Sequence, residues 1–190
     1  GYPWQKGETL NTAIGQGFVL CTPLQIATMM AAIANQTHVP QPHLVLSDDG
    51  PRLPEPQRRQ LGISPATLAV VKKALAGVVN EPSGTGGKAR LPGIMVAGKT
   101  GTAQVVGKKT YKDRTGNIPR KYEDHAWFAA IAPVEQPKIA VAVFCEHGGH
   151  GGSAAAPLVR EIIAAYLVPE NEGRPDVQST ADTDGQDEQD

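Results

Sequence analysis

The segment that most constrains the fold is the apolar run at 138–145, which holds no charged residue after Lys138. In a β-strand, successive side chains point to opposite faces, so the odd-numbered and even-numbered residues of this run form two separate surfaces. Both surfaces are apolar, since Val141 and Val143 share one of them and Ala142 and Phe144 share the other. A strand of this kind is stable only where it is covered on each side. The sequence therefore predicts a layered protein with this strand in its interior.

Two further runs, at 94–106 and 126–132, also have strand character. The gap between 132 and 138 is short enough for a hairpin, which favours antiparallel pairing. With helices on either side of these strands, the predicted fold class is α+β, an antiparallel sheet of three strands covered by helices.

The helices are predicted from their start and stop signals. At about 23–35 and 64–79, a hydroxyl residue precedes a proline, and apolar residues follow at helical spacing. The glycine cluster at 84–87 ends the second helix, and the segment 37–62 is predicted to be an irregular connection. A last helix is expected to begin at Ser153 or Ala156, just before Pro157, and to run through Leu158, Ile162 and Tyr166.

The chain has 190 residues and a formal net charge of -1, which suits one ordinary domain. The charge is uneven, because residues 169–190 contain eight acids and one base. We therefore expect a folded unit at 1–168 and an acidic, disordered tail at 169–190. The basic excess of the folded unit is too small to indicate nucleic-acid binding. No apolar run reaches the roughly 18–20 residues that span a bilayer.

The candidate chemistry centres on Gly98-Lys99-Thr100-Gly101-Thr102. Residues 93–100 satisfy the phosphate-loop pattern G-x-x-x-x-G-K-[ST], but that loop requires a helix after its lysine, and strand-like residues follow here. A strand is favoured, with Lys99 and Gly101 on one face and Thr100 and Thr102 on the other. Two hydroxyls can grip a carboxylate, a lysine adds positive charge, and a glycine lets a substrate backbone approach. An ordinary strand edge would carry the same residues, so this pattern alone leaves both interpretations open.

Longer motifs around the pentapeptide resemble a known family. Lys99-Thr100-Gly101 is similar to the third signature motif of the penicillin-recognising serine enzymes, whose other motifs are S-x-x-K and S-x-N. In order and spacing, the surrounding motifs resemble the C-terminal half of the transpeptidase domain in the penicillin-binding protein 2 family, the elongation-specific class B enzymes, over about residues 1–168. These motifs are Gly7-Glu8-Thr9, Ile14-Gly15-Gln16-Gly17, Thr22-Pro23-Leu24-Gln25, the stretch from Val96 to Gln104, His125-Ala126-Trp127-Phe128 and the glycine- and histidine-rich stretch from Glu146 to Pro157. The resemblance implies the penicillin-binding/serine β-lactamase-like fold.

The sequence departs from the family in its first two signature motifs. None of the serines is followed by lysine three places later or by asparagine two places later. In the family, both motifs lie upstream of the matching region, as does a membrane anchor. The resemblance therefore implies that this chain supplies half of an active site and is inactive by itself, because the nucleophile and its activating lysine belong to the other half.

The resemblance also implies a role for each residue of the predicted strand. Lys99 would act through its charge and hydrogen bonds beside the serine of the second motif. The hydroxyls of Thr100 and Thr102, next to Gly101, would hold the terminal carboxylate of a D-Ala-D-Ala stem peptide or of a β-lactam. The amide of Thr102 would be one of two oxyanion-hole donors. The expected catalytic residues are thus Lys99 and Thr102, all four residues are expected to bind substrate, and neither a metal nor a cofactor is required.

The implied function is cell-wall cross-linking during elongation, by a peptidoglycan D,D-transpeptidase that forms a serine acyl-enzyme. The alternatives are a septal-type class B penicillin-binding protein and a non-catalytic penicillin-binding sensor. The implied partners are stem peptides, β-lactams, the upstream half of the same protein and a glycan-strand polymerase, with no nucleic acid. The implied location is the periplasmic face of the bacterial inner membrane, through an upstream anchor.

Two other segments carry weaker hypotheses. The basic stretch at 105–124 follows the predicted strand directly, and it is interpreted either as a mobile flap beside the substrate cleft or as a solvated hairpin. His147 and His150 lie in a glycine-rich turn. A metal site is disfavoured there, because no acid or cysteine at ligand spacing accompanies them, and a turn from strand to helix is favoured.

Overall fold

The structure is a computed structural model that describes residues 3–36, 38–44, 59–105 and 118–168. Its main sheet contains β3 (Ala97–Ala103), β4 (His125–Ala132) and β5 (Ile139–Cys145), all antiparallel and in that spatial order. The three predicted strands are therefore confirmed. β3 is shorter than the predicted 94–106, because the chain before it forms a tight turn in which Leu91 bridges to Ile94.

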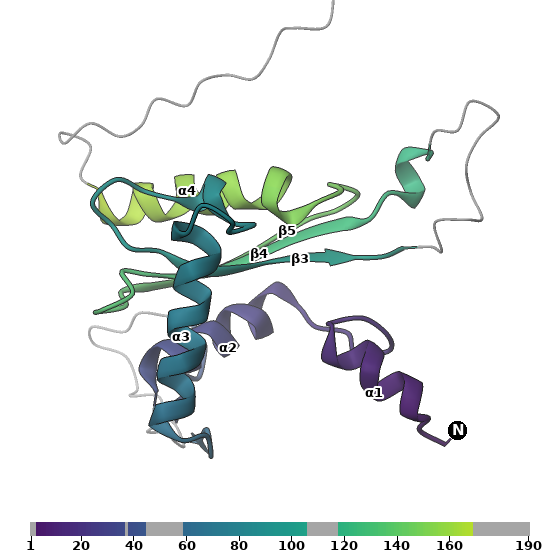
Figure 1. Cartoon of the computed structure of the whole chain (residues 1–190), viewed down its shortest axis with the longest axis horizontal. Helices are drawn as coiled ribbons and strands as arrows, with labels where there is room; N and C mark the ends of the chain where they lie inside the picture. The colour runs from purple at the N-terminus through teal and green to yellow at the C-terminus, as the bar shows by residue number, and fades with distance from the viewer. Residues whose placement is uncertain (1–2, 37, 45–58, 106–117, 169–190) are drawn as a thin grey trace, which may run out of the picture.

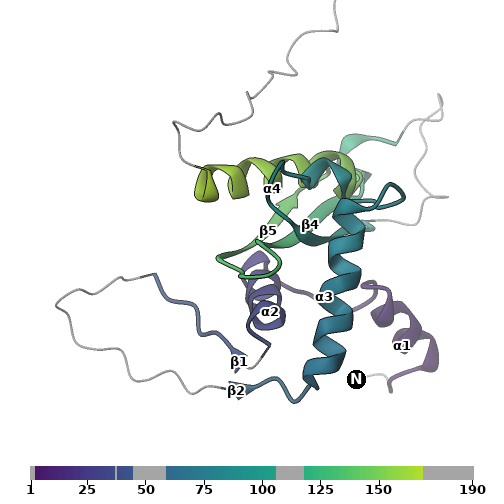
Figure 2. The ribbon, with the colours of Figure 1, turned by 60° about the vertical axis from the view of Figure 1, so that its left-hand side comes forward.

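Helices cover both faces of this sheet. α4 (Gly151–Leu167) lies along one face, α2 (Pro23–Asn35) lies against the other, and α3 (Pro65–Asn80) crosses at one side, where it contacts β3 (Figures 1 and 2). Two apolar clusters fill the layers, one around Phe128 and Val159 and the other around Met30 and Ile131. β5 contacts both α4 and α2. This arrangement confirms that the doubly apolar strand is covered on both sides and that the fold class is α+β.

The starts of α2 and α3 follow their predicted caps. The Thr22 hydroxyl accepts a hydrogen bond from the Gln25 amide at 3.2 Å, and the Thr22 amide donates to the Gln25 side chain at 2.8 Å. The Ser64 hydroxyl accepts from the Thr67 amide at 3.1 Å. These bonds satisfy amide donors that the first helical turn leaves free, which is why both helices begin at the predicted residues.

The prediction for the start of the last helix was wrong. α4 begins at Gly151, so Pro157 lies inside the helix rather than at its start. The helix does run through Leu158, Ile162 and Tyr166, as predicted. These three residues are exposed, whereas Val159 and Ile163 are fully buried. Apolar residues occur on several sides of this helix, so their spacing alone did not identify the side that packs on the sheet.

Several elements were not predicted. α1 (Lys6–Ala13) buries none of its residues, so it has no apolar stripe to reveal it. β1 (His38–Val39) pairs with β2 (Arg59–Gln60) inside the segment predicted to be irregular. Within the described ranges, the remaining elements are two single-turn 3₁₀ helices, η1 (Gly87–Ala89) and η2 (Arg120–Tyr122).

Parts of two hypotheses lie outside the described residues. Positions 106–117 of the basic stretch and the acidic tail at 169–190 are not described, so the flap and the tail stay predictions. Among the described residues, none of the helices is long and apolar enough to cross a membrane.

Candidate active site

β3 carries the candidate residues along an open edge, since β4 is its only strand neighbour in the described part of the chain. In antiparallel pairing, the N–H and C=O of one residue point to the same edge, and alternate residues point to opposite edges. The carbonyls of Thr100 and Thr102 accept hydrogen bonds from the side chains of Lys99 and Gln16. Both carbonyls therefore point away from β4, and the amides of Thr100 and Thr102 face the same open edge.

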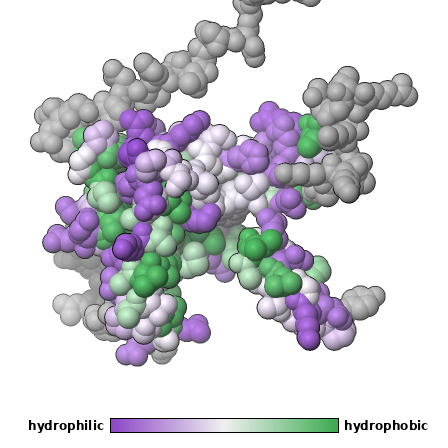
Figure 3. All heavy atoms as spheres, viewed as in Figure 1, coloured by the Kyte–Doolittle hydropathy of each residue, from purple (hydrophilic) through white to green (hydrophobic). Residues whose placement is uncertain are grey.

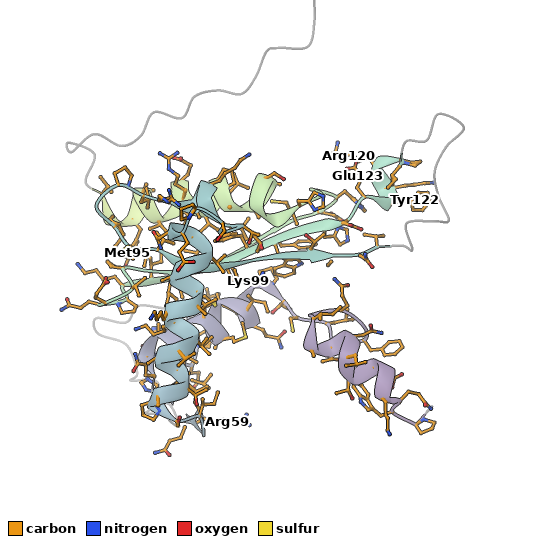
Figure 4. All side chains as sticks on the ribbon, viewed as in Figure 1. Arg59, Met95, Lys99, Arg120, Tyr122 and Glu123 are labelled. Carbon is orange, nitrogen blue, oxygen red and sulfur yellow. The ribbon has the colours of Figure 1, made fainter. Side chains whose placement is uncertain are left out.

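A cluster of one ammonium and two hydroxyl groups occupies this edge. The exposed Lys99 side chain donates from Nζ to the Thr100 carbonyl at 2.9 Å and to the Thr100 hydroxyl at 3.2 Å. The hydroxyl of Thr85 lies 3.1 Å from that of Thr100. Figure 4 shows Lys99 on β3, well away from Arg120 and Tyr122 at the far end of the sheet. A cation and hydroxyls that can turn their protons outward form a group suited to bind a carboxylate.

Thr85 reaches the cluster because the glycine-rich turn at 84–87 folds back over the end of α3. The Gly86 amide donates to the Val78 carbonyl at 2.9 Å. A Cβ at Gly84 would overlap that same carbonyl oxygen, so only glycine fits there. Asn80 then ties the end of α3 to the strand, because its Nδ2 donates to the Val96 carbonyl at 2.8 Å. α3 ends at Asn80, within one residue of the predicted end, and Glu81 after it is already extended before Pro82. The turn at 84–87 then places a hydroxyl beside Thr100.

The start of α4 packs directly on the backbone of β3 and β4. A Cβ at Gly151 would overlap the Trp127 carbonyl oxygen and lie 2.5 Å from the Gly101 carbonyl oxygen. A Cβ at Gly152 would lie 2.5 Å from the Thr85 carbonyl oxygen. The glycines let this helix lie closer to the sheet than any side chain would allow. The helix therefore supports the middle of β3, at Gly101, on the face that it covers.

His147 of the glycine-rich stretch holds the turn that leads into α4, and His150 is the residue just before that helix. The His147 amide donates to His125 Nδ1 at 2.9 Å, and His147 Nδ1 lies 3.1 Å from the Glu123 carbonyl oxygen. The His147 backbone is left-handed, with φ of 52°. The described residues contain no group of three metal-ligating side chains. The stretch thus has the geometry of a turn from strand to helix, as the sequence indicated.

The structure brings the four predicted site residues together on β3, from Lys99 to Thr102. It also excludes the phosphate-loop geometry, because Lys99 lies inside β3, which continues to Ala103, whereas a phosphate loop needs a helix that begins directly after its lysine. Two neighbours, Thr85 and Gln16, were missed as site residues. Thr85 lies in a segment interpreted only as a helix stop. Gln16 lies in a loop interpreted as close packing before the first helix, although its position in the family places that loop near the cleft. Neither has a local signal, since each contact joins positions far apart in the sequence.

Comparison with known proteins gives consistent matches. Residues 2–164 match the family described as the penicillin binding protein transpeptidase domain. Peptidoglycan D,D-transpeptidase MrdA of Haemophilus influenzae is 40% identical over 173 residues, which cover 87% of this chain and 26% of that protein.

Solved structures give the same result. Pseudomonas aeruginosa PBP2, in complex with WCK 5153, aligns with a TM-score of 0.73 and 36% identity over 89% of this chain and 34% of that one. Penicillin-binding protein A of Mycobacterium tuberculosis, in a ceftriaxone acyl-enzyme complex, aligns with a TM-score of 0.65 and 34% identity over 83% of this chain and 35% of that one. The chain therefore spans about a quarter to a third of the proteins that it matches.

Proposed function

The chain belongs to the family of penicillin-binding protein transpeptidase domains, and from that membership we propose that it supplies the Lys-Thr-Gly side of an elongation-type peptidoglycan D,D-transpeptidase active site. The observation that carries the proposal is the open edge of β3, where Lys99, Thr100 and Thr85 form a cluster suited to a carboxylate. The amide of Thr102 faces the same edge.

In the proposed reaction, an upstream serine attacks the carbonyl carbon between the two D-alanines of a stem peptide. The serine passes its proton to an upstream base, the terminal D-Ala leaves with a proton on its nitrogen, and an ester links serine and peptide. An amine of a neighbouring strand then attacks the ester, loses a proton and forms the new amide, while the serine oxygen regains its proton. A β-lactam would stop at the ester.

Each residue of the edge has a role in this proposal. The Thr102 amide donates to the oxygen that gains negative charge during attack, and a donor of this kind is worth about 3–4 kcal/mol in the transition state of acyl transfer. Lys99 acts through its charge and hydrogen bonds beside the serine of the second motif. The hydroxyls of Thr100 and Thr102 hold the terminal carboxylate, with Gly101 leaving room for the substrate backbone. The chemistry requires neither a metal nor a cofactor.

We further propose that residues 1–168 form the C-terminal part of the domain and that an upstream segment of the same protein completes it. Figure 3 shows α1 standing apart from the body, with apolar residues on its surface. Large apolar side chains are exposed along the first 24 residues, including Leu10, Ile14, Phe18, Leu20 and Leu24. So much exposed apolar surface marks a region that another part of the protein covers. In the whole protein, we place this domain at the periplasmic face of the inner membrane, working with a glycan-strand polymerase.

Labelling by a fluorescent penicillin, read after denaturation, tests the proposed function. We expect a covalent label when the chain is expressed together with its encoded upstream segment, and we expect the label on that segment. The isolated chain should remain unlabelled, because its part of the site holds the carboxylate but contains no nucleophile. Label on the isolated chain would place the nucleophile within it. No label in either case would favour a sensor without acylation chemistry.

Replacing Thr85 by valine should weaken recognition of the β-lactam carboxylate. The substitution preserves the shape of the side chain and removes the hydroxyl that faces Thr100. We expect the half-saturating penicillin concentration to rise about fivefold, the effect of losing one net hydrogen bond of about 1 kcal/mol. The measurement is the concentration dependence of labelling in the protein with its upstream segment. Ser83→Ala, in the same exposed loop, serves as the control, and equal values for the two variants would remove Thr85 from the site.

A further inference from the structure

The open edge of β3 receives one contact that the roles above do not explain. Gln16, in the loop between α1 and α2, donates from Nε2 to the Thr102 carbonyl at 2.7 Å. The two residues are 86 positions apart. Gln16 is half-buried, although most residues of its loop are exposed. The contact therefore belongs to the tertiary structure around the candidate site.

The backbone of this loop directs the Gln16 side chain to the strand. Gly15 and Gly17 flank it with φ of 75° and 91°, in the left-handed region that favours glycine. The Gln16 amide donates to the Asn11 carbonyl at 2.8 Å, so the loop closes on the last turn of α1. With its backbone fixed in this way, Gln16 loses little further freedom when its carboxamide binds the strand, and the donor is preorganised.

The position of the contact gives it a consequence for the reaction. Thr102 carries the amide proposed to stabilise the oxyanion, and its carbonyl lies on the same edge of the strand. An edge strand has no neighbouring strand on its open side, so a bond at this carbonyl holds the peptide group that follows Thr102. The amide lies in the peptide group before Thr102, and the two groups meet at the Thr102 Cα, so the bond restrains the amide through the backbone of residue 102. The donor also withdraws electron density from a carbonyl oxygen that would otherwise repel a nearby negative charge.

We infer that Gln16 is a positioning residue for acylation, acting through the Thr102 carbonyl on the oxyanion-hole amide. This inference rests on the proposed function. Gln16 touches the strand rather than the reacting atoms, so its effect should lie in the maximal rate of acylation and not in carboxylate binding.

The test uses the protein with its upstream segment and a time course of fluorescent-penicillin labelling at several concentrations. Gln16→Met, which preserves length without a donor, should lower the maximal acylation rate about tenfold, the equivalent of one hydrogen bond of about 1.4 kcal/mol. The half-saturating concentration should stay within about twofold of the wild type. Gln16→Glu should lower the rate further, because a carboxylate beside the Thr102 carbonyl repels both that oxygen and the developing oxyanion.

Gln25→Met provides the matched control. Gln25 belongs to the cap of α2, where its side chain accepts from the Thr22 amide, so its loss should lower the melting temperature and leave the acylation rate unchanged. If Gln16→Met acylates at the wild-type rate, the positioning role is wrong while the proposed function stands. A faster rate would also overturn it, since the carboxamide would then obstruct the edge. Absence of label in the wild type would overturn the proposed function, and this inference with it.

Discussion

Replacing Lys99 by methionine in the protein with its upstream segment should lower the rate of penicillin acylation by about 10²- to 10⁴-fold, the range typical of a group that assists proton transfer or stabilises charge in the transition state. Lys99 is the cation of the open edge, where its Nζ contacts the Thr100 carbonyl and hydroxyl. Methionine preserves most of the side-chain length and removes the charge. Because Lys99 is exposed, its loss should leave the melting temperature within about 2 °C of the wild type.

The matched control is Lys88→Met, at a second exposed lysine in η1 that lies outside the strand. Both variants change the net charge equally, so any general effect of charge on a negatively charged β-lactam is the same in each. We expect Lys88→Met to acylate at the wild-type rate. Similar rates for the two variants would show that Lys99 contributes only to the surface charge.

The sequence predicted those elements whose causes are local. Thr22 and Ser64 cap the helices that follow them by bonds that span three residues. The strands at 126–132 and 139–145 are apolar throughout, so their burial depends little on where the rest of the chain lies. The strand at Lys99 also has a local cause, because the alternation of side chains along a strand is enough to predict that the lysine lies on one face and the threonines on the other.

The parts that could not be predicted have tertiary causes. Thr85 and Gln16 reach β3 through turns whose paths depend on glycines at 84, 15 and 17, and on the positions of α3 and α1. α1 buries nothing in the described structure, so no apolar pattern marks it. Local patterns therefore identified the strand that carries the chemistry but not the side chains that other segments bring to it.

The start of α4 at Gly151 is the clearest example of a tertiary cause, because the helix propensities of its first residues oppose it. Two glycines open this helix although glycine is the poorest helix former after proline, and a proline follows inside it. Sequence signals therefore placed the start later, at Ser153 or Ala156. The helix extends to Gly151 because its first turn lies against the backbone of Gly101 and Trp127, where a Cβ has no space.

The substitution Gly151→Ala therefore distinguishes local from tertiary causes, since the two predict changes of opposite sign in the free energy of unfolding. Helix propensity alone predicts that alanine stabilises the protein by about 0.8–1 kcal/mol. The contacts predict the reverse, because the new methyl group would overlap the Trp127 carbonyl oxygen and lie 2.5 Å from that of Gly101. Both are backbone atoms of paired strands and cannot turn aside, so we expect destabilisation of about 3 kcal/mol, the upper end of the usual overpacking range.

Denaturant unfolding of the protein with its upstream segment measures this change in the free energy of unfolding. Gly87→Ala is the control, because a Cβ at Gly87 meets nothing within 4 Å. That control should change the free energy of unfolding by less than about 0.5 kcal/mol. Gly151→Ala should also slow acylation at temperatures where the protein stays folded, since relief of the overlap displaces β3 at Gly101, between Lys99 and Thr102. A variant as stable as the wild type, with an unchanged rate, would show that the start of α4 does not support the strand.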